Sequence, residues 1–123
     1  MSVCRGIRGA TVAEENTEEA IQGATRELLA QLIEANHIEE RDVAATYFTT
    51  TPDLTAGFPA TAARQLGWTS TALLGSCEMA VPGSMLRCVR VLILYNTDKE
   101  PRELVNLYLN GTTIDFKDEI MGR

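Results

Sequence analysis

The sequence predicts an α/β (α+β) fold, in which one domain combines a mixed β-sheet of about five strands with two main helices. The length of 123 residues corresponds to one ordinary domain. Segments rich in β-branched residues alternate with segments whose apolar residues recur at helical spacing. We expect the domain to span residues 1–110. Residues 111–123 have little apolar content, so we expect them to form a partly mobile tail.

The first part of the chain predicts a strand, a helix and a second strand. Residues 3–12 are partly β-branched and contain two glycines, which is typical of a strand that another group approaches closely. Residues 17–36 predict a helix, with Asn16 as the candidate N-cap and Glu19 reaching back to it. The apolar stripe of this helix consists of Ile21, Ala24, Leu28 and Leu32. Residues 43–51 are rich in β-branched and aromatic side chains and predict a strand.

A turn and a short helix come next. Residues 51–54, with the sequence Thr-Pro-Asp-Leu, are typical of a turn. Pro59 at the start and Gly67 at the end delimit a short alanine-rich helix. We expect a strand over residues 68–74 and a structured loop over residues 75–86, which contain two glycines and a proline.

The last part of the domain contains the clearest strand, over residues 88–96, which is apolar on both faces except at Arg90. Residues 98–103 predict a turn, and residues 104–109 predict either a strand or a helix. Two helices cannot cover both faces of a five-stranded sheet. We therefore expect the chain to form an oligomer.

Charge and hydropathy exclude several classes of partner. The net charge of -6 and the pI near 4.7 argue against nucleic acid, whose phosphates require a basic surface. The longest apolar run, residues 91–95, is far shorter than the roughly 20 residues that span a bilayer, so we expect no membrane partner. No charged-then-apolar leader pattern is visible, and we expect a cytoplasmic protein. All basic residues except Lys99 and Lys117 are arginines, whose planar forks suit a small anionic ligand.

The few cysteines and the single histidine argue against most metal sites and against most forms of nucleophilic catalysis. Cys4, Cys77 and Cys88 are odd in number and lack C-x-x-C spacing, so they indicate neither a disulfide framework nor a zinc site. His37 is the only histidine, which argues against a Ser-His-Asp triad and a multi-histidine metal site. We expect no cofactor and no metal. What remains is binding, or a reaction that depends on positioning and fixed charges.

Arg90 is the most informative single residue. Strand alternation places it with Leu92 and Leu94 on one face of an otherwise apolar strand, so its guanidinium is expected to be at least half-buried. A buried charge requires a partner. That partner is either an acid, such as Glu78 or one across a subunit interface, or an anionic ligand.

Five other residues have both an ordinary and a functional interpretation. Arg8 lies near two glycines that would let a ligand approach the backbone, yet it also fits a solvated strand residue, as does Arg5 on the opposite face. Glu78 is either an exposed loop acid or a partner of Arg90. Tyr108 is either a packed aromatic or a ligand contact, and Arg64 is by default a solvated helix residue.

Seven sequence blocks together resemble a known family. They are residues 5–11 (RGIRGAT), 51–54 (TPDL), 58–60 (FPA) with 63–64 (AR), 77–79 (CEM), 88–91 (CVRV), 96–98 (NTD) and 108–109 (YL). In this order and at nearly ungapped spacing, they resemble the AroH-type monofunctional chorismate mutases of bacteria such as bacilli. The resemblance implies a homotrimer with a pseudo-α/β-barrel and active sites at the subunit interfaces. It also implies conversion of chorismate to prephenate without a cofactor, in the cytoplasmic route to phenylalanine and tyrosine.

The resemblance also implies roles for individual residues. Arg90 would contact the ether oxygen and a carboxylate of chorismate, and Glu78 would accept from the ring hydroxyl. The substrate-binding residues would be Arg8, Tyr108, Arg64, Phe58, Ala60, Leu74, Gly75, Ser76 and Cys77. Family members often carry an arginine in the tail that helps to close the site. Residues 113–118 contain none, and Lys117 would be its substitute as a single charge.

Two other functions remain as alternatives. One is a trimeric enzyme like the imine deaminases, which share this general architecture and an interfacial arginine. The other is a non-catalytic protein that binds a small anion.

Overall fold

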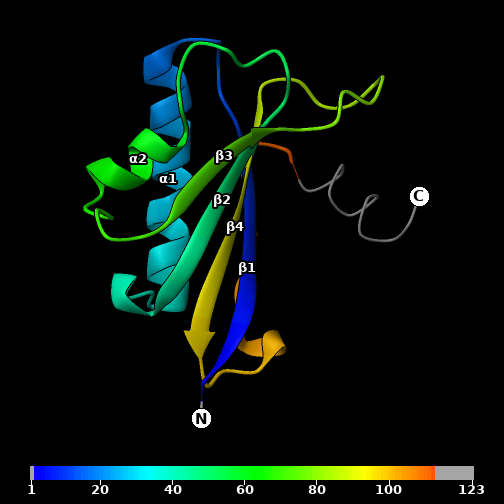
Figure 1. Ribbon diagram of the computed structural model, residues 1–123. Coiled ribbons are helices and arrows are strands. Elements are labelled where there is room, and N and C mark those ends of the chain that lie inside the picture. The colour runs from blue at the N-terminus through cyan, green and yellow to red at the C-terminus, as the bar shows by residue number, and fades with distance from the viewer. Residues whose placement is uncertain (1, 113–123) are drawn as a thin grey trace.

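The computed structural model describes residues 2–112 of the chain, shown as the coloured ribbon in Figure 1. The expected mobility of the tail beyond residue 112, and any role of Lys117 or Arg123, lie outside the described residues. The strands are β1 (Val3–Val12), β2 (Val43–Thr50), β3 (Leu73–Cys77), β4 (Cys88–Thr97) and β5 (Leu107–Tyr108). The helices are α1 (Glu18–Asn36) and α2 (Ala60–Gln65), with short 3-10 helices at Glu40–Asp42 and Pro101–Glu103.

The five strands form one mixed sheet in the order β3-β2-β4-β1-β5. The central strand β4 runs antiparallel to both of its neighbours, β2 and β1. The outer strands β3 and β5 run parallel to β2 and β1. The predicted fold class, a mixed sheet with two main helices, is therefore confirmed. The division into a domain of residues 1–110 and a tail stays a prediction.

Both helices lie on the same side of the sheet, as Figure 1 shows. The main core forms between this face and α1, and it includes Ile7, Leu28, Leu32, Phe48 and Ile93. No described helix covers the opposite face of the sheet. There the larger side chains remain partly exposed, as at Tyr47 (38%). The sequence-based expectation that two helices leave one face uncovered is confirmed for residues 2–112.

Side chains along β4 point alternately into the core and toward the uncovered face of the sheet. Val91 and Ile93 point into the core and are buried. Arg90, Leu92 and Leu94 alternate with them and are half-buried on the uncovered face. The half-buried position predicted for Arg90 is confirmed.

Gly9 allows β1 to lie close to both α1 and β5. A Cβ at this position would lie 2.9 Å from Cδ1 of Leu32 and 3.2 Å from the carbonyl oxygen of Leu107. The second distance involves backbone, which cannot move aside as a side chain can. The absence of a side chain at Gly9 thus sets how closely β5 approaches β1.

The start of α1 differs in detail from its prediction. Thr17 is the N-cap, and its hydroxyl accepts from the backbone N–H of Ala20. The prediction of Asn16 as the cap was wrong. Asn16 instead binds the loop before α2, where its side-chain oxygen accepts from the backbone N–H groups of Thr55 and Ala56. The α1 helix ends at Asn36 as predicted, and His37 follows in the left-handed conformation.

The strand predicted over residues 68–74 begins too early, because only Leu73 and Leu74 of that range belong to β3. Trp68 follows Gly67, which has a positive φ of 98°, and is buried in the core rather than paired in the sheet. The carboxylate of Glu40 accepts from the N–H of Ser70 and the hydroxyl of Thr71, which holds this segment as a turn. Pairing begins only at Leu73, so β3 occupies the start of the segment predicted as a loop.

Among the helices that the structure describes, none has the length and apolar character that crossing a membrane would require.

Candidate active site

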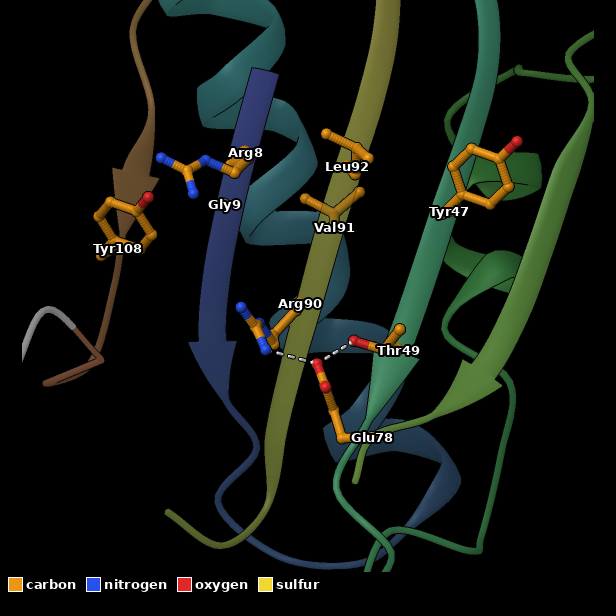
Figure 2. A pocket seen from close by; sticks show the side chains of 9 residues that line it. All are labelled: Arg8, Gly9, Tyr47, Thr49, Glu78, Arg90, Val91, Leu92 and Tyr108. Atoms are coloured by element: carbon orange, nitrogen blue, oxygen red, sulfur yellow. Dashed lines mark hydrogen bonds and ion pairs between the residues drawn. The ribbon is translucent and has the colours of Figure 1, made fainter. Parts of the chain in front are cut away.

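A pocket of about 250 Å³ lies on the uncovered face of the sheet, and Figure 2 shows its lining. The lining residues come from all five strand regions and are Arg8, Gly9, Tyr47, Thr49, Glu78, Arg90, Val91, Leu92 and Tyr108. Four of these were predicted from sequence, namely Arg8, Glu78, Arg90 and Tyr108. The fold therefore brings together in one chain residues that are up to 100 positions apart in sequence.

Arg90 and Glu78 form an ion pair in this pocket. Nη1 of Arg90 lies 2.9 Å from Oε2 of Glu78, and their side chains are 31% and 22% exposed. The same carboxylate oxygen accepts a hydrogen bond of 2.6 Å from the hydroxyl of Thr49. Thr49 and Arg90 are direct partners in the register of β2 and β4, so their side chains emerge side by side. Figure 2 shows both groups converging on the carboxylate.

The backbone at Glu78 is held by the end of the sheet. Its N–H donates to the carbonyl of Thr50 at 2.8 Å, which extends the ladder between β2 and β3 by one bond. The loop leaves the sheet only after this point. Glu78 is thus a sheet-edge residue rather than a solvated loop acid, and its charge is directed toward β4.

Arg8 and Tyr108 form the other end of the pocket. Figure 2 shows the guanidinium of Arg8 extending from β1 toward the ring of Tyr108 on β5. The Tyr108 ring packs on Ala10 and Cys88, which places it on the uncovered face. Arg5 takes no part, because it lies against the Pro101–Glu103 turn and faces Glu100 at 3.7 Å.

Asparagine side chains tie the short strand β5 to the rest of the chain. The buried Asn36, at the end of α1, accepts from the N–H of Val105 at 2.8 Å and donates to its carbonyl at 2.9 Å. Asn106 accepts from the N–H of Arg8, and Asn110 donates to the hydroxyl of Thr11. These bonds fix β5, and with it Tyr108, beside β1.

The other predicted site residues lie outside this pocket, toward the β3 edge of the sheet. They are Phe58 just before α2, Ala60 and Arg64 in the first and last turns of α2, and Leu74, Gly75, Ser76 and Cys77 along β3. Phe58 and Leu74 are 77% and 58% exposed. The predicted residues therefore form two sets on one chain. The first set, Arg8, Glu78, Arg90 and Tyr108, lines the pocket, and the second set, just listed, lies outside it.

Sequence reasoning missed five lining residues, namely Gly9, Tyr47, Thr49, Val91 and Leu92. Alternation along β2 placed Tyr47 and Thr49 on one face, which was a usable signal. It did not reveal that β2 lies next to β4, because strand order cannot be read from alternation alone. The contribution of Gly9 depends on how closely β5 approaches, which no local pattern shows.

The charges of the pocket define what it can hold. Two guanidinium groups, of Arg8 and Arg90, face one carboxylate, that of Glu78, so the lining carries net positive charge inside an acidic chain. Arginine forks bind carboxylates in two-point contacts, and Glu78 accepts from hydroxyl donors. Residues 2–112 contain no group of three or more side chains that would hold a metal ion. Fold and site together define a mixed α/β protein with a site for a small organic anion.

Comparison with known proteins identifies the family within this class. The family model described as chorismate mutase type I matches residues 4–118. The chorismate mutase AroH of Thermus thermophilus is 52% identical over 106 residues, covering 85% of this chain and 87% of that protein. The chorismate mutase AroH of Bacillus subtilis (strain 168) is 40% identical over 111 residues, covering 89% and 87%.

A solved structure agrees with these relatives. The chorismate mutase from Clostridium thermocellum superposes with a TM-score of 0.87 at 46% identity, covering 89% of this chain and 98% of that one. The chain belongs to the chorismate mutase type I family, and with it to the isomerases. The resemblance predicted from the sequence is confirmed. Neither alternative, the imine-deaminase-like enzyme or the non-catalytic anion-binding protein, is favoured.

Proposed function

We propose that the pocket on the uncovered face is where this chain rearranges chorismate to prephenate. The observation that carries the proposal is the half-buried pair of Arg90 and Glu78 beside Arg8 and Tyr108. Chorismate is a dicarboxylate with a ring hydroxyl. The pocket offers two guanidinium groups and one hydrogen-bond acceptor, which match those features in number and charge.

The reaction requires only fixed charges and a fixed conformation. It is an intramolecular Claisen rearrangement, so one carbon–oxygen bond breaks while a carbon–carbon bond forms, and no group leaves the molecule. Negative charge grows on the ether oxygen and positive charge spreads over the ring. A guanidinium held at the oxygen stabilises the first, in the manner of a preorganised oxyanion site. A carboxylate beside the ring stabilises the second.

The residues take roles according to their positions. Arg90 donates to the ether oxygen and a carboxylate, because its side chain is half-buried at the centre of the sheet. Glu78 accepts from the ring hydroxyl. Arg8 and Tyr108 hold a carboxylate at the β5 end of the pocket. By binding both ends of the substrate, these groups hold the enolpyruvyl arm over the ring, which lowers the entropic part of the barrier.

The second set of predicted residues completes the site from a neighbouring subunit. A pocket of about 250 Å³ is at the small end of ligand sites, and it lies on the sheet face that no described helix covers. Phe58, in the loop before α2, and Leu74, on the edge strand β3, expose apolar surface that a neighbouring subunit can cover. In a cyclic homotrimer with a pseudo-α/β-barrel, the first set of each subunit would face one neighbour and the second set would face the other neighbour. Arg64, Ala60 and residues 75–77 would then line the substrate from the second side.

The place of this reaction in the cell follows from its family. It belongs to aromatic amino acid biosynthesis, and we place the enzyme in the cytoplasm, without nucleic-acid or membrane partners. Residues 1–110 form the catalytic domain, and no cofactor takes part.

The first test is the activity itself. Purified protein mixed with chorismate should accelerate loss of chorismate and formation of prephenate far beyond the uncatalysed rate. Arg90→Ala, measured in parallel, should abolish most of the acceleration. No acceleration by the unaltered protein would overturn the proposed function, even if the protein bound chorismate.

The second test addresses the shared site. Arg90→Ala and Arg64→Ala variants each damage one of the two sets. When the two variants are mixed, unfolded and refolded together, every mixed trimer contains an interface at which both sets are intact. Activity should therefore reappear in the mixture, and light scattering should report the mass of a trimer. A mixture no more active than its components would contradict the interfacial site.

A further inference from the structure

The carboxylate of Glu78 is held by a second donor that the family resemblance did not predict. The hydroxyl of Thr49 donates to Oε2 of Glu78 at 2.6 Å, and Arg90 donates to the same oxygen at 2.9 Å. Both bonds therefore end on one carboxylate oxygen, as Figure 2 shows. Arginine and carboxylate groups otherwise tend to pair as two forks, with both oxygens engaged.

Thr49 is built to hold a fixed position. It lies in β2, between β4 and β3, with Arg90 and Ser76 as its register partners. Its β-branched side chain has few accessible χ1 angles, so the hydroxyl has little freedom. Glu78 has a longer side chain, and it is the last residue tied to the sheet before the loop begins. The direction of the Glu78 carboxylate is therefore set from β2.

We propose that Thr49 is a positioning residue, which keeps Glu78 from closing a two-oxygen fork on Arg90. This inference rests on the proposed function. With Oε2 shared by Thr49 and Arg90, Oε1 is available to accept from the ring hydroxyl of the substrate. Without the Thr49 hydroxyl, the two charged side chains pair with each other, and the substrate has to separate them before it reacts.

The test uses three variants. Thr49→Val keeps the shape of the side chain and removes the hydroxyl, whereas Thr49→Ser keeps the hydroxyl. Thr71→Val is the matched control, because Thr71 donates a hydrogen bond of 2.8 Å to Glu40 outside the pocket. We expect Thr49→Val to lower kcat by about 10- to 100-fold, the range that displacement of a catalytic group produces. Thr49→Ser should stay within about threefold of the unaltered enzyme, and Thr71→Val should leave kcat and KM unchanged.

A double-mutant cycle shows whether Thr49 affects kcat through Glu78. If Thr49 acts through Glu78, Thr49→Val should cause no further loss in a Glu78→Gln background. An equal loss in both backgrounds would overturn the proposal, as would wild-type kinetics of Thr49→Val. Failure of Thr49→Ser to restore activity would also overturn it. If Thr49→Val does not fold, Thr49→Ala removes the same hydroxyl with a smaller side chain.

A crystal structure of Thr49→Val gives a readout that does not depend on turnover. The proposal expects both oxygens of Glu78 on the Arg90 guanidinium in the ligand-free protein. An unchanged single-oxygen contact would overturn it. If the unaltered chain fails to accelerate the rearrangement, the proposed function fails, while this structural result still tests the role of Thr49.

Discussion

Arg90 and Glu78 pair 2.9 Å apart on the uncovered face of the sheet, with side chains that are 31% and 22% exposed. An ion pair and a ligand site were alternative interpretations of Arg90 in the sequence. The structure shows that the pair itself lines the pocket. Glu78 provides the half-buried guanidinium with a partner of opposite charge, and both charges face the pocket.

The fork of Arg90 is expected to matter more than its charge. Arg90→Lys retains the charge but replaces a planar group with five donors by a single ammonium. Kcat should fall by about 100- to 1,000-fold, the cost of removing an oxyanion donor elsewhere. Steady-state kinetics with chorismate measure the effect. Arg41→Lys is the control, because the Arg41 side chain is 82% exposed. An Arg90→Lys enzyme with nearly full kcat would refute the assigned role.

Gly9 should tolerate no side chain. In Gly9→Ala the new Cβ would lie 3.2 Å from the Leu107 carbonyl and closer still to the leucines of α1. We expect the free energy of unfolding to fall by about 1–3 kcal/mol, as in other overpacked cores. Gly23→Ala is the contrast, because that Cβ would meet only Arg26, at 3.9 Å, within α1. It should stabilise the helix by about 0.5–1 kcal/mol. Urea denaturation measures the free energy of unfolding of both variants. Equal changes in that free energy would contradict the packing argument.

Asn36 should link stability to substrate affinity. Asn36→Ala leaves the backbone N–H and carbonyl of Val105 without their partner, which should cost about 2–4 kcal/mol of unfolding free energy. Because β5 carries Tyr108, KM for chorismate should rise more than kcat falls. Asn16→Ala removes a comparable set of bonds to Thr55 on the surface and should leave KM unchanged. Equal KM values for the two variants would show that β5 needs no such anchor.

Asp53 should contribute stability that is lost in acid. Partial burial raises the pKa of its carboxyl, but hydrogen bonds from Thr51 and from the backbone of Arg87 and of Asp53 outweigh it, so the pKa lies below 3.8. The folded state thus favours the charged form. The contribution is complete above the ordinary pKa and disappears as the pH falls through the lowered one. Unfolding free energies of Asp53→Asn should therefore depend less steeply on pH in that acid range. Parallel curves for the variant and the unaltered chain would exclude this contribution.

Much of the fold was predictable because the local patterns are strong. The alternation of residues 88–96 indicated the central strand and the position of Arg90. Proline and glycine indicated the bounds of α2. The error at residues 68–74 has a tertiary cause, since Trp68 is buried as a single anchor and Glu40 holds the following turn. The capping error at Asn16 arose because Thr17, one residue later, has an equally suitable side chain.

The site was predictable in its charges but not in its geometry. The order of the sequence motifs was enough to identify Arg8, Glu78, Arg90 and Tyr108 as candidates. Thr49 was not identified, because its role depends on lying opposite Arg90 in a neighbouring strand. Register between β2 and β4 is a property of the whole sheet, and a single sequence does not encode it in any one segment.

The alternation of β4 has a practical consequence for protein engineering. Substitutions at Val89 and Ile93 alter packing beneath the sheet, whereas changes at Leu92 reach the substrate side. Thermal tolerance and substrate preference can therefore be optimised on one ten-residue strand in separate libraries.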